Sequence, residues 1–153
     1  MARAQSMSDR GLNLSIAVEE GRMDLQREGA QLRGMTVRIG APHTVGAPPG
    51  ERRITPPLGR RRVAKVVDGT YAWEVPEWVY AHRGRPAPRD RAVRGALGDI
   101  AVLLDDGTVL YSLPEVGPLA DPAYVVPGGV RVEADDLRAI LANLEPGLPV
   151  YFH

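Results

Sequence analysis

The side chains that most often perform chemistry in proteins are scarce in this sequence of 153 residues. Cysteine is absent, which excludes disulfides, thiolate zinc sites, iron–sulfur ligation and a cysteine nucleophile. The three histidines, His43, His82 and His153, are far apart along the chain, so a histidine-based metal site is not expected. The sequence contains no glycine-rich phosphate loop of the Walker or Rossmann type. We therefore predict no metal and no cofactor.

Two other places could supply reactive groups, a pair of carboxylates and a serine. Asp105 and Asp106 could act together in acid–base catalysis, but Gly107 follows them, and this tripeptide between two apolar runs is typical of a hairpin turn. Ser112 could be a nucleophile only beside a base, and no histidine is predicted there, because His82 belongs to a different loop. We interpret the aspartates as turn residues.

Basic residues are concentrated in the first part of the chain. Residues 1–94 contain 17 of the 19 lysines and arginines and 10 of the 19 acidic residues, although the formal net charge of the chain is zero. The asymmetry could provide a basic face for an anionic partner, but we favour attraction between the two parts within one fold. The densest cluster is Arg52, Arg53, Arg60, Arg61 and Arg62. It could bind nucleic acid, but a strand would divide it between two faces and no aromatic residues are interleaved, so we favour a solvated face or a protein interface.

The elements that must position these residues are mainly strands. Alternation of apolar and polar residues predicts a meander of short strands over residues 12–39. Further strands are predicted over 62–67, 70–75, 100–104, 108–113, 130–132 and 148–152, with hairpin-type turns at 68–69 and 105–107. Segments rich in proline and glycine are predicted as loops at 41–59, 82–91 and 114–129.

One helix is predicted close to the end of the chain. Leu137, Ile140, Leu141 and Leu144 have the spacing of a single apolar helix face. Aspartates occupy the first turn, and Pro146-Gly147 ends the helix. On this assignment, a Leu141→Asp substitution should unfold the domain. The predicted fold is mainly β, with one late helix packed on a sheet or sandwich.

The length of the chain fits one domain. We expect an N-terminal extension over residues 1–11 and a single domain over 12–153. Residues 1–10 are polar and charged and lack the apolar stretch of a secretory signal. No run approaches the roughly 20 apolar residues that a membrane helix needs.

Four segments follow one another in an order that resembles a known family. They are LSIAVEEGRMDLQREGAQLRGMTVRIG, then ITPPLGRRRVAKVV with Thr55, Pro56 and Gly59 matching the family pattern, then TYAWEVPEW, then GVRVEADDLRAILANLEPGLPVYF. Together they resemble the catalytic domain of YkuD-type L,D-transpeptidases, which cross-link peptidoglycan stem peptides. The resemblance covers residues 12–152. It implies an L,D-transpeptidase-like β-sandwich with one C-terminal α-helix and long Pro/Gly-rich loops, and a place in the cell envelope, for which the chain shows no signal peptide.

The reactive signature of that family is changed in this chain. The family has an upstream histidine and a Ser/Thr-His-Gly-Cys-Ile/Val-Arg motif, in which the cysteine is the nucleophile and backbone N–H groups hold the oxyanion. The resemblance places the cysteine at Gly129, the motif histidine at Pro127 and the upstream histidine at Tyr111. Only Gly128 and Arg131 match. The resemblance therefore implies the family fold with no catalytic residue remaining.

Residues around the former reaction centre are candidates for binding. Arg131 could bind a peptide carboxylate through paired hydrogen bonds, or it could hold loop carbonyls in place. Tyr71, Trp73 and Trp78 could line a groove for a sugar or peptide, or they could pack in the core. We favour the structural role in both cases, and we keep Arg131, Trp73, Tyr71 and Gly128 as the candidate binding set.

Three functions remain open at this point. The first is a catalytically inactive domain that acts as a structural or protein-interaction subunit, with the loops and arginines contacting protein partners in a larger complex. The second is a pseudoenzyme that binds peptidoglycan stem peptides. The third, ranked last, is an active peptidoglycan L,D-transpeptidase with a relocated nucleophile.

Overall fold

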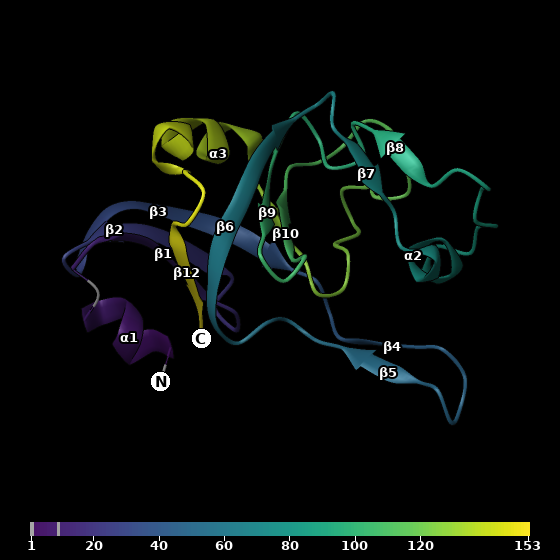
Figure 1. The fold of residues 1–153 in the computed structure, drawn as a ribbon, viewed down its shortest axis with the longest axis horizontal. Coiled ribbons are helices and arrows are strands. Elements are labelled where there is room, and N and C mark those ends of the chain that lie inside the picture. The colour runs from purple at the N-terminus through teal and green to yellow at the C-terminus, as the bar shows by residue number, and fades with distance from the viewer. Residues whose placement is uncertain (1, 9) are drawn as a thin grey trace.

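The computed structural model describes residues 2–8 and 10–153. Its elements, in chain order, are α1 (Ala2–Ser8), β1 (Leu12–Ala17), β2 (Arg22–Arg27), β3 (Ala30–Ile39), β4 (His43–Val45), β5 (Arg52–Ile54), β6 (Gly59–Asp68), β7 (Ala72–Glu74), α2 (Glu77–His82), β8 (Ala92–Arg94), β9 (Ile100–Leu104), β10 (Val109–Tyr111), β11 (Val130–Val132), α3 (Ala134–Ile140), the 3₁₀ turn η1 (Leu141–Asn143) and β12 (Pro149–Phe152). Eight strands form a closed ring in the order β1-β12-β6-β9-β10-β11-β3-β2 (Figure 1). The pairs β4–β5 and β7–β8 form separate two-stranded sheets.

Two strands of ten residues, β3 and β6, join the two halves of the ring. Strand β3 pairs with β2 along most of its length and with β11 at its end. Strand β6 pairs with β12 over residues 59–62 and with β9 over 63–68, and its register shifts between Val63 and Lys65. Such a bulge increases the local bend of a strand. Because both strands pass from one sheet into the other, the two sheets of the predicted sandwich close into a barrel.

Two parallel pairings connect segments that are far apart in the sequence. Strand β12 lies between β1 and β6, with Leu14 opposite Val150 and Ile16 opposite Phe152. Strand β11 runs parallel to β10, and the loop 112–129 makes the connection between them. Parallel neighbours require long crossover connections. The loops that carry the candidate site are therefore fixed at both ends by strands of the same barrel.

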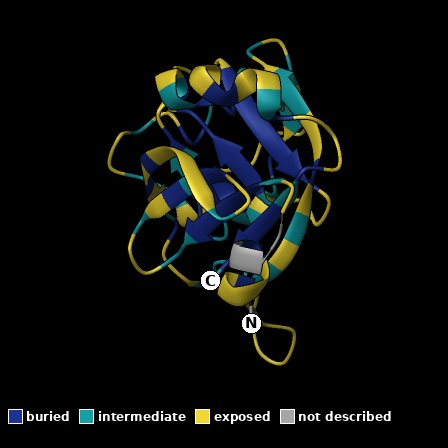
Figure 2. Cartoon of the chain, turned by 90° about the vertical axis from the view of Figure 1, so that its left-hand side faces the viewer, coloured by how far each residue is buried: buried dark blue, intermediate teal, exposed yellow. Residues whose placement is uncertain are grey.

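The barrel interior is filled by apolar side chains. Alternation along β1 directs Leu14 and Ile16 inward, and neither is exposed to solvent. Strands β2 and β12 add Met23, Leu25, Val150 and Phe152 to the same core. Figure 2 shows these strands in dark blue, enclosed by helices and loops with exposed yellow segments. The predicted inward alternation of the N-terminal meander is confirmed.

A second core lies on the other side of β9. Val102 and Leu104 face the barrel interior, whereas Ala101 and Leu103 join a cluster formed with α2 and the loop 112–129. Both faces of β9 are therefore buried, which explains why this strand is a continuous apolar run rather than an alternating one.

Helix α1 covers the outer face of β1, which accounts for the polar residues buried there. Ser6, Asn13 and Gln26 are almost fully buried. The Gln26 side-chain amide donates to Asn13 Oδ1 and to the Ser6 carbonyl, both at 3.1 Å, and the Ser6 hydroxyl donates to Asn13 Oδ1 at 3.2 Å. Each of the three side chains is thus hydrogen-bonded. The sequence did not predict this helix, and the boundary between residues 11 and 12 stays a prediction.

Three other details differ from the sequence-based expectations. The segment 41–59, predicted as a loop, contains the antiparallel hairpin β4–β5. Helix α2 was not predicted. Strand β7 pairs with β8 rather than with β6, so the turn at Asp68-Gly69 does not form a hairpin. These elements have only three to six residues, too few to display a clear period.

Helix α3 corrects one predicted core residue. Leu137 and Ile140 are buried as expected, and so is Leu144, but Leu141 is 45% exposed. The α-helix ends at Ile140, and the chain continues as a 3₁₀ turn from Leu141 to Asn143. A 3₁₀ turn has three residues instead of 3.6, which displaces Leu141 from the inward face. The expectation that Leu141→Asp unfolds the domain assumed that Leu141 is buried, and this assumption is wrong.

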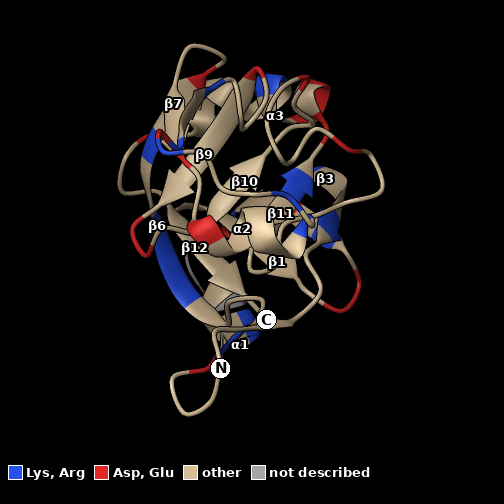
Figure 3. Cartoon of the chain, turned by 90° about the vertical axis from the view of Figure 1, so that its right-hand side faces the viewer, with Lys and Arg blue, Asp and Glu red and all other residues tan. Residues whose placement is uncertain are grey.

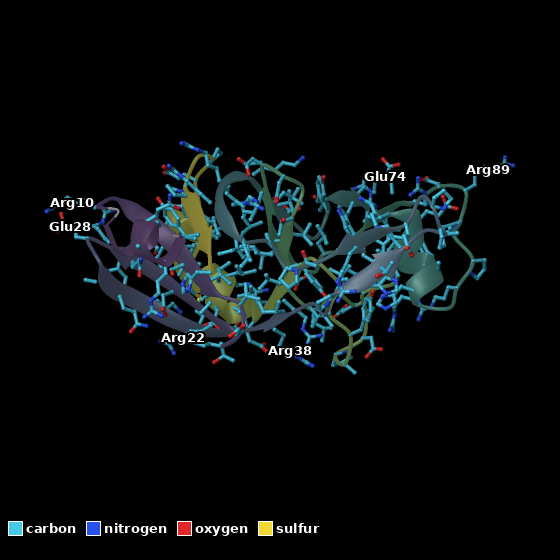
Figure 4. The ribbon with its side chains drawn as sticks, turned by 90° about the horizontal axis from the view of Figure 1, so that it is seen from below. Arg10, Arg22, Glu28, Arg38, Glu74 and Arg89 are labelled. Atoms are coloured by element: carbon cyan, nitrogen blue, oxygen red, sulfur yellow. The ribbon has the colours of Figure 1, made fainter. Side chains whose placement is uncertain are left out.

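The predicted mainly β fold with a C-terminal helix is confirmed. Charged side chains project outward at both ends of the molecule, where Figure 4 labels Arg10 and Glu28 at one end and Glu74 and Arg89 at the other. Among residues 2–8 and 10–153, no helix is both long and apolar enough to cross a membrane.

Candidate functional site

A cavity of about 590 Å³ lies where the resemblance places the former reaction centre. One wall is the end of the 112–129 loop, including Val126, Pro127, Gly128 and Gly129. The other walls come from β5 and the segment after it, from the β9–β10 turn, and from the region around α2. The further lining residues are Arg52, Ile54, Thr55, Pro56, Pro57, Leu58, Arg61, Trp73, Pro76, Trp78, Asp106, Gly107, Thr108 and Val109.

At Gly129, where the resemblance places the family nucleophile, a side chain would collide with a neighbouring residue. A Cβ atom on this residue would lie 2.6 Å from Val126 Cγ1 and 3.4 Å from Val109 Cγ2. The backbone is also fixed, because the Gly129 N–H donates to the Val126 carbonyl at 2.9 Å and the Gly129 carbonyl accepts from the Gly40 N–H at 3.0 Å. The space beside Gly129 is therefore filled by the Val126 side chain.

Gly128 is required by its backbone conformation as well as by its surroundings. Its φ is +81°, in the left-handed region that favours glycine. A Cβ atom there would lie 2.9 Å from Ile54 Cγ2 of strand β5. Pro127, where the resemblance places the motif histidine, is buried and lines the cavity without a titratable group. Gly128 thus lets the 126–129 turn approach the hairpin β4–β5 closely.

Tyr111, where the resemblance places the upstream histidine, supports the same turn through a hydrogen bond. Its side chain is fully buried, and its hydroxyl oxygen accepts the Val126 N–H at 3.1 Å. Burial raises the pKa of Tyr111, so the phenol stays neutral. The residue does not line the cavity, and it fixes the backbone whose Val126 side chain packs beside Gly129.

Arg131, which the resemblance matches to the arginine of the family motif, contacts the 112–129 loop. Its Nη1 donates to the main-chain carbonyls of Asp121 at 3.3 Å and Tyr124 at 3.2 Å. These contacts match the loop-holding alternative of the sequence analysis. Arg131 is not among the residues that line the cavity, and binding of a ligand carboxylate by this residue stays a prediction.

The aromatic candidates divide between the cavity and its surroundings. Trp73 and Trp78 both line the cavity, and they are the two tryptophans of the sequence. Each is half-buried and packs against the second core cluster. Tyr71 lies outside the cavity, with Lys65 Nζ 4.5 Å from its ring centroid. The two interpretations of the tryptophans, groove wall and core packing, therefore both describe part of their contacts.

The arginine cluster is divided by the strands that carry it, as the alternation predicts. Arg52 and Arg61 line the cavity. Arg53 donates to Thr44 Oγ1 at 3.4 Å, and the Arg60 guanidinium lies 5.8 Å from the centroid of the Tyr151 ring. Arg62 is exposed. Figure 3 shows the basic residues of β6 as a blue stretch along the strand.

The two aspartates of the β9–β10 turn have structural partners. Arg61 Nε donates to Asp106 Oδ2 at 2.6 Å, and Asp106 Oδ1 accepts the Thr108 N–H at 3.0 Å. Although burial alone would raise it, the pKa of Asp106 is lowered by the hydrogen bonds from Arg61 and Thr108. Asp105 Oδ1 accepts the Arg62 N–H at 3.2 Å. The prediction of a hairpin turn over 105–107 is confirmed.

Ser112 is buried and lies outside the cavity. Its hydroxyl donates to the Ile100 carbonyl at 2.8 Å and accepts the Ile100 N–H at 3.4 Å. These bonds tie the end of β10 to the start of β9. They give the serine a structural role that sequence reasoning did not foresee.

The structure brings together two histidines that the sequence keeps apart. The imidazole rings of His43 in β4 and His82 in α2 are stacked, and His82 Nδ1 lies 2.8 Å from the Tyr124 hydroxyl. The pKa of His82 is lowered by desolvation and by the nearby His43 and Arg83. Among residues 2–8 and 10–153, no group of three or more histidines and carboxylates could hold a metal ion. No sequence signal could have revealed the pair, because it depends on how the fold brings strand β4 against helix α2.

Comparison with solved structures identifies the fold. The L,D-transpeptidase of Xylanimonas cellulosilytica (residues 123–326) superposes with a TM-score of 0.62 at 18% identity, over 95% of this chain and 62% of that one. L,D-transpeptidase 1 of Mycobacterium tuberculosis gives 0.56 at 16% identity, over 93% and 61%. An L,D-transpeptidase of Mycobacterium smegmatis gives 0.58 at 16% identity, over 93% and 58%.

The chain therefore has the fold of the L,D-transpeptidase catalytic domain, as the sequence resemblance implied. It spans about three fifths of the length of these solved structures. No family model matches the sequence, and no curated protein matches it either.

Proposed function

We propose that this chain is a catalytically inactive L,D-transpeptidase-like domain that acts as a structural or protein-interaction subunit. The observation that carries the proposal is the contact between Val126 and Gly129. The side chain of Val126 fills the space that a nucleophile on residue 129 would need. A cysteine at residue 129 would therefore require the Val126 side chain to move, in addition to the substitution itself.

The groups around Gly129 support the same proposal. The whole sequence contains no cysteine, Pro127 cannot act as a base, and the Tyr111 hydroxyl is hydrogen-bonded to the main chain. The hydroxyl of Ser112, the alternative nucleophile, is hydrogen-bonded to Ile100 and is nearly inaccessible. A serine nucleophile needs both an adjacent base and access to substrate.

The proposal is tested by acyl transfer on a peptidoglycan tetrapeptide stem, with products followed by mass spectrometry. We expect no transfer by the unaltered chain or by the Gly129→Cys variant, because Val126 leaves no space for the thiol and no histidine lies at position 127. Measurable transfer by the unaltered chain would overturn the proposal. If that transfer were lost in a Ser112→Ala variant, the active-enzyme alternative with Ser112 as nucleophile would replace it.

A second candidate function is favoured by the persistence of the cavity. The space of about 590 Å³, with two tryptophans on its walls, is large enough to hold a peptide segment. The chain would then be a pseudoenzyme of the cell envelope that binds stem peptides without reacting with them. Retention on purified peptidoglycan would support this alternative, and free passage would leave the protein-interaction function.

A further inference from the structure

We propose that the cavity beside Gly129 binds an extended, acidic segment of a partner protein. Arg52 would bind the carboxylates of this segment, and Trp73 and Trp78 would contact its apolar side chains. The inference rests on the proposed function and names the class of partner for the same site. It follows from three observations: an uncompensated cation on the wall, a free strand edge beside it, and apolar surfaces that suit the remaining side chains of a peptide.

The first observation is the charge of Arg52. This side chain is exposed, lines the cavity and makes no ion pair or side-chain hydrogen bond within the part of the chain that the structure describes. Arg61, the other arginine on the wall, is paired with Asp106 at 2.6 Å. Arg52 is therefore the cavity-lining arginine whose charge is not neutralised by a carboxylate of the described residues. A ligand carboxylate would match the planar donor geometry of its guanidinium.

The second observation concerns the strand that carries Arg52. Strand β5 belongs to a two-stranded sheet with β4, so its other edge has no strand neighbour among the described residues. Figure 1 shows the β4–β5 hairpin extending away from the barrel. A free edge can pair with an extended peptide, whose main-chain hydrogen bonds then contribute affinity. This favours an extended protein segment over a small anion.

The third observation is the apolar part of the wall. Arg52 and Ile54 both line the cavity, whereas Arg53 between them does not, as expected from alternation along a strand. Trp73 and Trp78 line the same cavity. A segment that contains both acidic and apolar residues would supply carboxylates to Arg52 and apolar side chains to the indoles.

The experiment uses tryptophan emission, because Trp73 and Trp78 are the two tryptophans of the sequence and both line the cavity. The full chain is titrated with an eight-residue L-peptide of alternating glutamate and leucine, with both ends blocked. The control peptide alternates lysine and leucine. We expect a saturable change in emission with the acidic peptide, weakened by added salt, and no saturable change with the basic peptide.

Two neighbouring arginines give matched variants. Arg52→Gln should lower the affinity about tenfold or more, the loss expected when a charge-assisted hydrogen bond is removed. Arg53→Gln removes the same charge from the same strand but not from the cavity, and should change the affinity less than about twofold. Thermal melting of both variants checks that the fold is intact.

Several results would overturn the inference. They are equal responses to the two peptides, equal weakening by the two arginine variants, or no emission change at all. A tetrapeptide stem that saturates the site more tightly than the acidic peptide would replace the inference with the stem-binding alternative. Turnover of that stem, followed by mass spectrometry in the same samples, would instead refute the proposed function.

Discussion

The imidazole rings of His43 and His82 are stacked with their centroids 3.9 Å apart and their planes 23° apart. The contact joins the β4–β5 hairpin to helix α2. Residues of both elements line the cavity, Arg52 and Ile54 from the hairpin and Trp78 from the helix. The histidine pair therefore helps to set the distance between two walls of the site.

The histidine pair predicts that acid weakens the fold. The pKa of His82 is lowered by desolvation, by His43 and by Arg83, so protonation is less favourable in the folded state than in the unfolded chain. Its contribution to stability is present above the unfolded pKa of about 6.5 and is lost as the pH falls through that value toward the folded pKa. We expect the melting temperature to be lower at pH 5.5 than at pH 7.5.

Substitution isolates the contribution of this residue. His82→Gln keeps a polar group beside the Tyr124 hydroxyl, but the glutamine side chain does not titrate. The difference in melting temperature between pH 5.5 and pH 7.5 should therefore become smaller. Part of it should remain, because desolvation also lowers the pKa of His153. A higher melting temperature at pH 5.5 than at pH 7.5 would contradict this account.

The filled space beside Gly129 predicts a coupled pair of substitutions. Gly129→Ala should cost about 1–3 kcal/mol of unfolding free energy, because its Cβ would lie 2.6 Å from Val126 Cγ1. Val126→Ala creates room, so the double variant should be more stable than the sum of the two single changes predicts. Urea denaturation measures all four proteins. Gly50→Ala is the control, because the nearest atom to its Cβ would be 3.6 Å away. Additive costs of the substitutions at Gly129 and Val126 would contradict the close packing of these two residues.

Helix α3 offers a test of the corrected core assignment. Leu137 is fully buried and Leu141 is 45% exposed. Leu137→Ala should cost about 2–5 kcal/mol, whereas Leu141→Ala should change the unfolding free energy by about 0.5 kcal/mol or less. Leu141→Asp should also remain folded by circular dichroism. Unfolding of that variant would restore the inward assignment made from the sequence.

Two glutamines test the polar contacts beneath α1. Gln26 is buried and donates to Asn13 and Ser6, whereas Gln31 is exposed and donates to Asp24 at 2.7 Å. Gln26→Ala removes the donor to the Ser6 carbonyl and one of the two donors to Asn13 Oδ1, and should cost about 1–3 kcal/mol. Gln31→Ala exposes its partner to water and should cost less than about 1 kcal/mol. Chemical denaturation of the two variants provides the comparison, and equal losses would contradict it.

The sequence predicted those parts of the fold whose signals are local. Alternation around Leu14 and Ile16, the turn before Gly107, and the spacing of Leu137 and Ile140 each concern neighbouring residues. The resemblance to L,D-transpeptidases also brought Gly128 and Gly129 to the candidate site, and both line the observed cavity.

The remaining features depend on contacts between distant segments. The stacking of His43 on His82 and the insertion of β12 between β1 and β6 require the chain to return from far away. The space filled by Val126 cannot be read from residue types, because glycine at position 129 is equally compatible with an empty pocket. Packing, rather than local propensity, determined these features.

The closed ring of strands also bears on how the protein behaves at high concentration. Each of its eight strands has a strand neighbour on both sides, although residues 30–36 of β3 pair with β2 alone, so most of the main chain of the ring is unavailable for edge-to-edge association between molecules. Free edges also occur in the short pairs β4–β5 and β7–β8, and Arg52 and Arg53 lie on β5. Like charges on the β4–β5 ribbon repel the same ribbon of a second copy, which disfavours pairing between copies while leaving this edge free for a partner of opposite charge.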